Sequence, residues 1–481
     1  MLSRLSVAGA RARRLSATLG LAVLAIVLEG CTANAPHRLT PAGEAVATRV
    51  RTGDLETAEG RRRIASSALE VHDDFQLAFL EFDDQGNLFS RAPLDLLFRT
   101  LQEEAERPDA PRLILFLFAH GWKNDARLCN RNVCCFRSLL SRIAADMRLV
   151  AEHSPEAIRP YRIIGIFVGW RGLSATIPPF RELSFYARKR AAHAIGQGEL
   201  VELLTFLDRF QNHLNEPDPQ RCRLVILGHS FGGAMLYSAV ANVLKSRIVE
   251  ARVKAVLSGA DEPIEGFGDL VVLANPAFEA SLYQPLQGLI DDFPAFAPGQ
   301  RPVLVILESE TDTDTRTFFK LGRTVATLFQ RTGPRSPRPL LVTAAGNYAP
   351  FVTHRATLNE RVRAAQPASR LGTVAGCRCG LAMPELPEEA VERISEVVRA
   401  GPGRAPAARP PSRCPGVERL GVVDLECTAT RPPGLPLWVV RASSDVISGH
   451  SGFFTRPVTD IVRGLVSENV LQKLSAQTVS R

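Results

Sequence analysis

The sequence predicts an α/β protein built on a doubly wound, mostly parallel sheet. Short apolar runs rich in β-branched residues alternate along the chain with longer amphipathic segments. Such nearly continuous apolar runs are typical of parallel strands buried on both faces. The longer segments repeat apolar residues at intervals of three and four, as helices do when one face packs on a sheet. Apolar residues make up 45% of the 481 positions, which is enough to fill a large core.

Seven segments carry the strand pattern, and the first of them alternates and then ends in a turn. In chain order they are FQLAFLEFDDQGNL (75–88), RLILFLFAHGW (112–122), RIIGIFVGW (162–170), RLVILGHS (223–230), DLVVLANP (269–276), PVLVILES (302–309) and LPLWVVRAS (435–443). Amphipathic periodicity predicts helices at 198–214, 232–253 and 459–476, the last of which begins with a Thr cap. Alternation of strands and helices indicates the α/β class.

The last two predicted strands are separated by an unusually long stretch of chain. It contains PLLVTAAGNY (339–348), a helical pattern at 386–400 and a loop rich in Pro, Gly and Arg at 401–416. We expect residues 325–434 to form a long insertion before the last strand.

The N-terminus has the pattern of an export signal. Arginines precede an apolar run, LGLAVLAIVL (19–28), that is too short to span a membrane. LEGC, Leu28 to Cys31, resembles the lipobox of bacterial lipoproteins, in which Cys31 would be lipidated and become the new N-terminus. Glu29 departs from that pattern, because the position before the small residue is usually uncharged. The alternatives are a secreted protein cleaved near CTANA and a retained apolar helix.

This organisation predicts a signal peptide at 1–30, a tether at 31–70 and a single domain at 71–481. We expect an exported protein held at the cell envelope through lipid on Cys31. The net charge of +8 falls to +5 once the four arginines and one glutamate of the signal are removed. The remaining cations are scattered and lack interleaved aromatics, so nucleic acid is not an expected partner.

Nine cysteines fit export to an oxidising compartment. With Cys31 lipidated, eight remain, and an even number suggests disulfides. Pairing within CNRNVCC (129–135) and pairing of Cys377 and Cys379 with Cys414 and Cys427 are the obvious choices, although spacing alone does not determine connectivity. A metal site at Cys377-Arg-Cys379 is disfavoured because zinc sites use C-x2-C spacing.

The segment GHSFG (228–232) is a G-x-S-x-G between a predicted strand and a predicted helix. In that context the motif forms a nucleophile elbow, a tight turn that exposes the Ser230 hydroxyl beside the N-terminus of a helix. A Gly-rich turn with an inert serine is the alternative. A serine needs a base to remove its proton and donors to hold the oxyanion that forms.

The base and the acid follow the chain order Ser, acid, His that accompanies this elbow. His450 comes after the last strand and is the predicted base; His354 precedes that strand and is the rival. The acid is expected in the cluster that follows the strand 302–309. Asp312 is the first choice there, and Asp445 is the alternative. The acid would orient the imidazole and stabilise its charged form.

The chain resembles the α/β-hydrolase superfamily, and more narrowly a group of bacterial envelope serine esterases of the lipoprotein type. The resemblance covers about residues 70–475 and is carried, in order, by HGWKND, FVGWRGLS, RKRAAHAIGQGEL, LGHSFGGAMLYS, LANPAFEA, ESETDTDT and DVISGHSGFF. Many members have G-x-x-D after the strand that precedes the acid, and here Ser309 stands in place of the Gly. The cysteine-rich CNRNVCC and the long insertion also depart from the family.

The resemblance implies a serine hydrolase that cleaves carboxylic esters, with no cofactor. It implies that the N–H groups of Trp122, in the HG-X segment, and Phe231 form the oxyanion hole, while His120 is structural. A small-molecule or lipid ester is the expected substrate. The alternatives are lipase, thioesterase or amidase activity on the same triad, or a non-catalytic envelope binding protein that keeps the fold.

Overall fold

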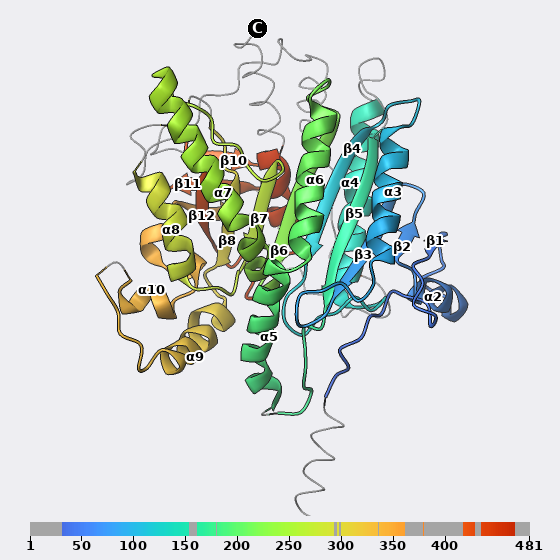
Figure 1. The fold of residues 1–481 in the computed structure, drawn as a ribbon, viewed down its shortest axis with the longest axis horizontal. Coiled ribbons are helices and arrows are strands. Elements are labelled where there is room, and N and C mark those ends of the chain that lie inside the picture. Colours follow the sequence, from blue (N-terminus) through green and yellow to red (C-terminus); the bar gives the residue numbers. More distant parts are fainter. Residues whose placement is uncertain are drawn as a thin grey trace, which may run out of the picture.

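A computed structural model describes residues 31–152, 161–178, 180–292, 296–297, 300–334, 336–360, 379, 417–428 and 434–466. Within these residues twelve strands form one sheet, in the order β1-β2-β3-β5-β4-β6-β7-β8-β12-β9-β11-β10 (Figure 1). The eight strands from β3 to β9 in that order are mutually parallel, while antiparallel pairs occur only nearer the two edges. The α/β class with a mostly parallel sheet is therefore confirmed.

All seven segments predicted as strands contain one. These strands are β3 (Phe75–Phe82), β4 (Arg112–Ala119), β5 (Tyr161–Trp170), β6 (Cys222–His229), β7 (Leu270–Ala274), β8 (Leu304–Ser309) and β12 (Leu437–Ala442). Every residue of β6, β7 and β8 is buried, as expected for strands covered on both faces. The other strands are β1 (Ala47–Arg49), β2 (Leu69–Val71), β9 (His354–Leu358), β10 (Val417–Leu420) and β11 (Val423–Cys427).

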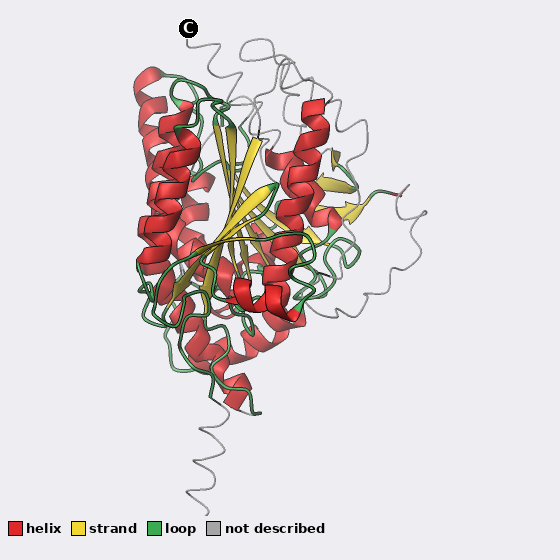
Figure 2. Cartoon of the chain, turned by 90° about the vertical axis from the view of Figure 1, so that its right-hand side faces the viewer, coloured by secondary structure: helices red, strands yellow, loops and turns green. Residues whose placement is uncertain are grey.

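Helices cover both faces of the sheet (Figure 2). One layer contains α3 (Ala92–Ala105), α6 (Leu200–Asn215), α7 (Phe231–Ser258) and α8 (Ala280–Asp291), and α5 (Phe180–Gln197) packs on α7. The opposite layer contains α4 (Arg131–Glu152) and a helix at 456–466, which are joined by an ion pair between Arg463 and Asp146. No helix in the described part of the chain is long and apolar enough to cross a bilayer.

Short helices complete the described residues. They are α2 (Ala58–Ala65), a π-helical turn η1 (Asp314–Phe318), α9 (Phe319–Ala326), α10 (Arg338–Val342) and the 3-10 turns η2 (Ala345–Asn347) and η3 (Ala349–Phe351). The helices predicted at 198–214 and 232–253 are α6 and α7. The helix predicted at 459–476 begins at 456 and is described to 466. The helix expected at 386–400 and the loop at 401–416 lie outside the described residues.

Two stretches expected to be peripheral contribute strands to the sheet. Residues 31–70, expected to be a tether, contain β1, α2 and part of β2. Arg38 in this stretch is 1% exposed and lies 3.7 Å from the ring centroid of Phe79. Within the expected insertion 325–434, strands β9, β11 and β10 extend the sheet beyond β12. Both stretches are thus parts of the folded body wherever the structure describes them.

Residues 31–70 are joined to helix α4 through a buried carboxylate, that of Glu70. Glu70 accepts a 3.0 Å hydrogen bond from Arg38 and two of 2.8 Å from Arg137 of α4. Burial raises the pKa of Glu70, but the charge of Arg137 and the hydrogen bond to His72 outweigh it and hold the pKa well below its usual value. The two guanidinium groups and the carboxylate therefore stay ionised inside the protein.

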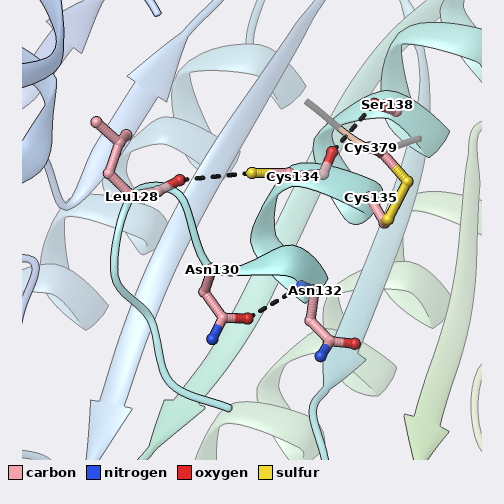
Figure 3. The surroundings of a disulfide bond; sticks show 7 residues. All are labelled: Leu128, Asn130, Asn132, Cys134, Cys135, Ser138 and Cys379. Carbon is pink, nitrogen blue, oxygen red and sulfur yellow. Dashed lines mark hydrogen bonds between the residues drawn. A yellow bond between two sulfur atoms is a disulfide. The ribbon is translucent and has the colours of Figure 1, made fainter. Parts of the chain in front are cut away.

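The cysteines pair differently from the expected pattern (Figure 3). Cys135 on α4 forms a disulfide with Cys379, 244 residues away. Cys129 and Cys427 also form disulfides, whereas Cys134 and Cys222 are buried thiols. The prediction of pairing within CNRNVCC is wrong, and so is the prediction that Cys379 pairs with Cys414 or Cys427. Consecutive cysteines on a helix point in different directions, so Cys134 lies against the Leu128 carbonyl while Cys135 faces Cys379.

We predict that Cys135→Ala lowers the free energy of unfolding by ~2–5 kcal/mol, because a cross-link that closes a long loop restricts the unfolded chain. Cys134→Ala is the matched control and removes only a buried thiol. Urea unfolding without reductant measures both variants. Peptide mapping without reductant should find Cys135 linked to Cys379 and Cys134 alkylated only after unfolding. An alkylated Cys135 in the native, unreduced chain would contradict the pairing.

Candidate active site

Ser230 occupies a strained turn between β6 and α7. Its backbone has φ 56° and ψ −118°, a combination that a side chain disfavours and that costs ~1–3 kcal/mol. Hydrogen bonds hold it there, because the Ser230 N–H donates to the Ala274 carbonyl at 3.0 Å and its carbonyl accepts from Ala234 and Ala277, each at 3.1 Å. The structure therefore has a tight, strained turn at Ser230, between β6 and α7, where the sequence predicts one.

Two glycines leave room for this turn. A Cβ on Gly232 would lie 2.1 Å from the Ala119 carbonyl oxygen at the end of β4. A Cβ on Gly121 would lie 2.7 Å from the Cβ of Ser230. Both distances are far below van der Waals contact, so any side chain at either position would displace the elbow from β4.

The structure brings the three predicted catalytic residues into one hydrogen-bonded chain. Nε2 of His450 lies 2.8 Å from the Ser230 hydroxyl, and its Nδ1 lies 2.7 Å from Oδ2 of Asp312. Because an ionised carboxylate only accepts, Nδ1 carries a proton and Nε2 is free to accept one from Ser230. The Asp312 side chain is fully buried and that of His450 is 17% exposed.

Asp312 is arranged to remain ionised. Its second oxygen, Oδ1, accepts from the backbone N–H groups of Asp314 at 2.8 Å and Thr315 at 3.2 Å. Burial raises the pKa of Asp312. The hydrogen bond and charge of His450, together with the hydrogen bonds from Thr315, lower that pKa by more than burial raises it, so the pKa of Asp312 is below its usual value. These donors come from the first turn of η1, directly after β8.

Two side chains at the ends of neighbouring strands, one from the last residue of β6 and one from the residue after β7, hold the loop that carries His450. Nδ2 of Asn275 donates to the carbonyls of Gly449 at 3.1 Å and His450 at 2.9 Å. His229 Nε2 lies 2.7 Å from the same His450 carbonyl and must donate to it. Burial, followed by the charge of His450, lowers the pKa of His229 to about 3, so His229 is neutral.

Ser309, at the position where many α/β hydrolases have Gly, links β8 to the same loop. Its hydroxyl donates to the Ile447 carbonyl at 2.7 Å, and its N–H donates to Oδ1 of Asn275 at 2.8 Å. Thr311 adds a contact by accepting from the Gly449 N–H at 3.0 Å. The substitution therefore supplies a hydroxyl that fixes the base loop against β8.

The HG-X loop is fixed by the histidine that sequence analysis assigned a structural role. His120 is fully buried; its Nε2 accepts from the Trp170 N–H at 3.2 Å, and its carbonyl accepts from the Trp170 indole at 3.0 Å. Burial lowers the pKa of His120 to about 4. The loop after His120 is also bonded to Gly172, whose carbonyl accepts from the Lys123 backbone N–H at 3.1 Å. Within the described residues neither the Trp122 nor the Phe231 backbone N–H has an acceptor.

The rival candidates lie elsewhere. Asp445 is exposed, and the Nδ1 atom that it would orient is bonded to Asp312. His354 is buried in β9, where its ring lies 4.1 Å from that of Trp438 and burial lowers its pKa to about 4. Cys31 is exposed, and its backbone forms an isolated antiparallel β-bridge with Ala175, beyond the end of β5. Of the two cysteines at which a metal site was disfavoured, Cys379 is in a disulfide and Cys377 lies outside the described residues.

A second buried carboxyl group, that of Glu308, shares a hydrogen-bonding partner, Thr315, with Asp312. Its Oε1 accepts from the Thr315 hydroxyl at 2.5 Å and from Asn347 at 2.6 Å, while its Oε2 is buried without a partner among the described residues. Burial, followed by the charge of Asp312, raises the pKa of Glu308 to about 8. Glu308 is therefore mostly protonated at neutral pH and adds little negative charge beside the acid.

The residues that support the site leave no signal in the sequence. Asn275 ends the LANP segment and His229 is the x of G-x-S-x-G, but neither position predicts a bond to a residue more than 170 positions away. The described residues contain no group of His, Cys, Asp or Glu that would hold a metal ion. Comparisons of the chain with models of protein families, with curated proteins and with solved structures find no match.

We predict that Glu308→Gln becomes more stable relative to the parent chain as pH rises from about 4.5 to about 8, the range between the usual and folded-state pKa values. Over that range folded Glu308 holds a proton that the unfolded chain releases, so the parent loses stability with rising pH by several kcal/mol. Glutamine cannot ionise and avoids the loss. Urea unfolding at a series of pH values tests this, with Glu310→Gln as the matched control. A stability difference that does not change with pH would contradict the assignment.

Proposed function

We propose that this protein is a serine hydrolase that cleaves carboxylic esters through an acyl-enzyme, on a fold of the α/β-hydrolase type. The observation that carries the proposal is the continuous hydrogen-bonded chain from Ser230 through His450 to Asp312. The strained elbow and the order Ser, Asp, His along the chain support the same reading.

The reaction follows from the positions of the protons. Ser230 Oγ attacks the ester carbonyl carbon while its proton passes to Nε2 of His450, and the resulting imidazolium is stabilised by Asp312. The tetrahedral intermediate collapses with cleavage of the ester C–O bond, and the leaving alkoxide takes the proton from Nε2. A water molecule then attacks the acyl-enzyme, again giving its proton to His450, and the acid is released as Ser230 is regenerated.

The oxyanion is held by the backbone N–H groups of Trp122 and Phe231. Phe231 is the first residue of α7, a 28-residue helix whose positive dipole end faces the developing charge. The Trp122 ring packs edge-on against Phe185 at 5.4 Å, and Phe185 lies 4.7 Å from the Phe231 ring. This aromatic group beside the two donors suits the acyl part of an ester. Export and lipid attachment at Cys31 belong to the same proposal.

We predict that a fluorophosphonate probe labels Ser230 and that Ser230→Ala lowers turnover of a nitrophenyl ester by ~10⁴–10⁶-fold. Ser238→Ala is the matched control on the same helix. Ser238 also contacts a histidine, His193 at 2.7 Å, but its hydroxyl proton is donated to the Ala234 carbonyl at 3.0 Å. Absence of labelling in the folded protein would favour the non-catalytic binding protein instead.

We also predict that Asn275→Ala lowers kcat by ~10–100-fold while KM changes little, because the His450 loop loses two donors and the base is misplaced. Gln300→Ala is the control, since Gln300 is another buried amide that bonds backbone groups, those of Ile264 and Arg301. Steady-state kinetics and unfolding curves, measured on both variants, distinguish a misplaced His450 from a loss of overall stability. Equal kcat losses in both variants would show a general effect of destabilisation.

A further inference from the structure

Helix α9, the last residue of η1 before it and the turn after it together present apolar side chains to the outside of the molecule. Phe318, Leu321, Val325, Leu328 and Phe329 have exposed fractions of 63%, 62%, 68%, 59% and 96%, and we call these five residues the α9 face. Helices at the surface of a soluble protein place polar residues on their outer side. A contiguous exposed apolar patch of this kind marks a surface that contacts something apolar.

The opposite side of α9 fixes its orientation. Phe319 is 1% exposed, and Lys189 lies 5.0 Å from its ring centroid. Gly322 packs so closely on α5 that a Cβ would overlap the Tyr186 hydroxyl. Arg323 forms an ion pair with Glu279 at 2.6 Å. These contacts set which side is buried, so the apolar residues of the α9 face are held outward.

The charges around the α9 face indicate what covers it. Residues 315–342 contain six Lys and Arg and no Asp or Glu. Three of these cations, Arg316, Lys320 and Arg331, are exposed beside the apolar residues. An apolar helix face flanked by cations is typical of helices that lie in the interface of an anionic bilayer, where each cation contributes ~1 kcal/mol.

The α9 face lies beyond the same edge of the sheet as Thr32, which is near the start of the described residues. Thr32 donates to the Ser174 carbonyl at 3.1 Å, just beyond the carboxyl end of β5. Helix α9 follows β8, and β8 runs parallel to β5 in the same sheet. Thr32 and α9 therefore both lie beyond the edge at which these two strands end (Figure 1). The uncharged apolar run at 19–28 precedes Cys31. A membrane that holds the chain through lipid on Cys31 would face the same end of the molecule as α9.

We propose that the α9 face is a membrane-binding surface that inserts its apolar residues into an anionic bilayer and orients the domain upon it. This proposal does not depend on the catalytic one, because it concerns residues outside the triad.

The test uses the full chain bound to vesicles of phosphatidylcholine and phosphatidylglycerol whose acyl chains carry bromine, which quenches tryptophan at short range. Phe329→Trp is the reporter, and the parent chain supplies the background of its three tryptophans. Val256→Trp is the matched control, because Val256 is 78% exposed but lies near the far end of α7, roughly 39 Å of helix from Ser230. We expect quenching of the added tryptophan at 329 and none at 256.

Because the exposed cations attract anionic lipid, we predict that Lys320→Glu with Arg331→Glu, made in the Phe329→Trp chain, reduces this quenching, and that 0.5 M salt reduces it as well. Three results would overturn the proposal. One is a chain that floats with the vesicles while the tryptophan at 329 remains unquenched. Another is equal quenching in pure phosphatidylcholine. The third is an emission shift that grows with protein concentration without lipid, which would show that a second copy of the chain covers the face.

Discussion

The site depends on the close approach of β4 to the turn after β6. Register pairs Ala119 with Gly228, and the Ala119 carbonyl then faces Gly232 with no space for a side chain. Ser230 is strained because it must turn the chain at this point from a buried strand into α7. The energy for that strain comes from the sheet itself, through hydrogen bonds such as the one from Ser230 to Ala274. The position of the Ser230 hydroxyl, in a residue that is only 2% exposed, is therefore a consequence of the packing of three strands.

Parallel pairing also explains why distant residues meet. Strands β6, β7, β8 and β12 all end at one edge, so the residues that follow them become neighbours at separations that range from 34 positions (Asn275 and Ser309) to 221 positions (His229 and His450). Asn275 follows β7 and bonds both the Ser309 N–H of β8 and the loop after β12. This amide is at the centre of the network, and it joins β8 to the loop that carries His450 without a hydrogen bond to the side chain of Asp312 or of His450.

The sequence was sufficient to predict the central strands and to choose Ser230, Asp312 and His450 as residues that would meet, because burial of a parallel strand and the turn after β6 each leave a local signature. Supporting contacts such as His229 with the His450 carbonyl have no local signature, since they depend on side chains reaching across strand ends. Disulfide pairing failed for a similar reason. Cys134 and Cys135 are adjacent in sequence, yet the rotation of a helix directs only Cys135 to Cys379. The extra strands β9–β11 are short and lie near an edge, where propensity says little.

The two carboxyl groups beside each other, Asp312 and Glu308, show how the protein separates their protonation states. Both are fully buried, so burial alone would raise both pKa values. Asp312 receives backbone donors and the imidazole, which favour its ionised form. Glu308 has fewer donors and feels the charge of Asp312, which favours its neutral form. One negative charge is thus concentrated on the group that contacts His450, and the difference is produced by the first turn of η1, whose backbone N–H groups point at Asp312 while the Thr315 side chain reaches Glu308.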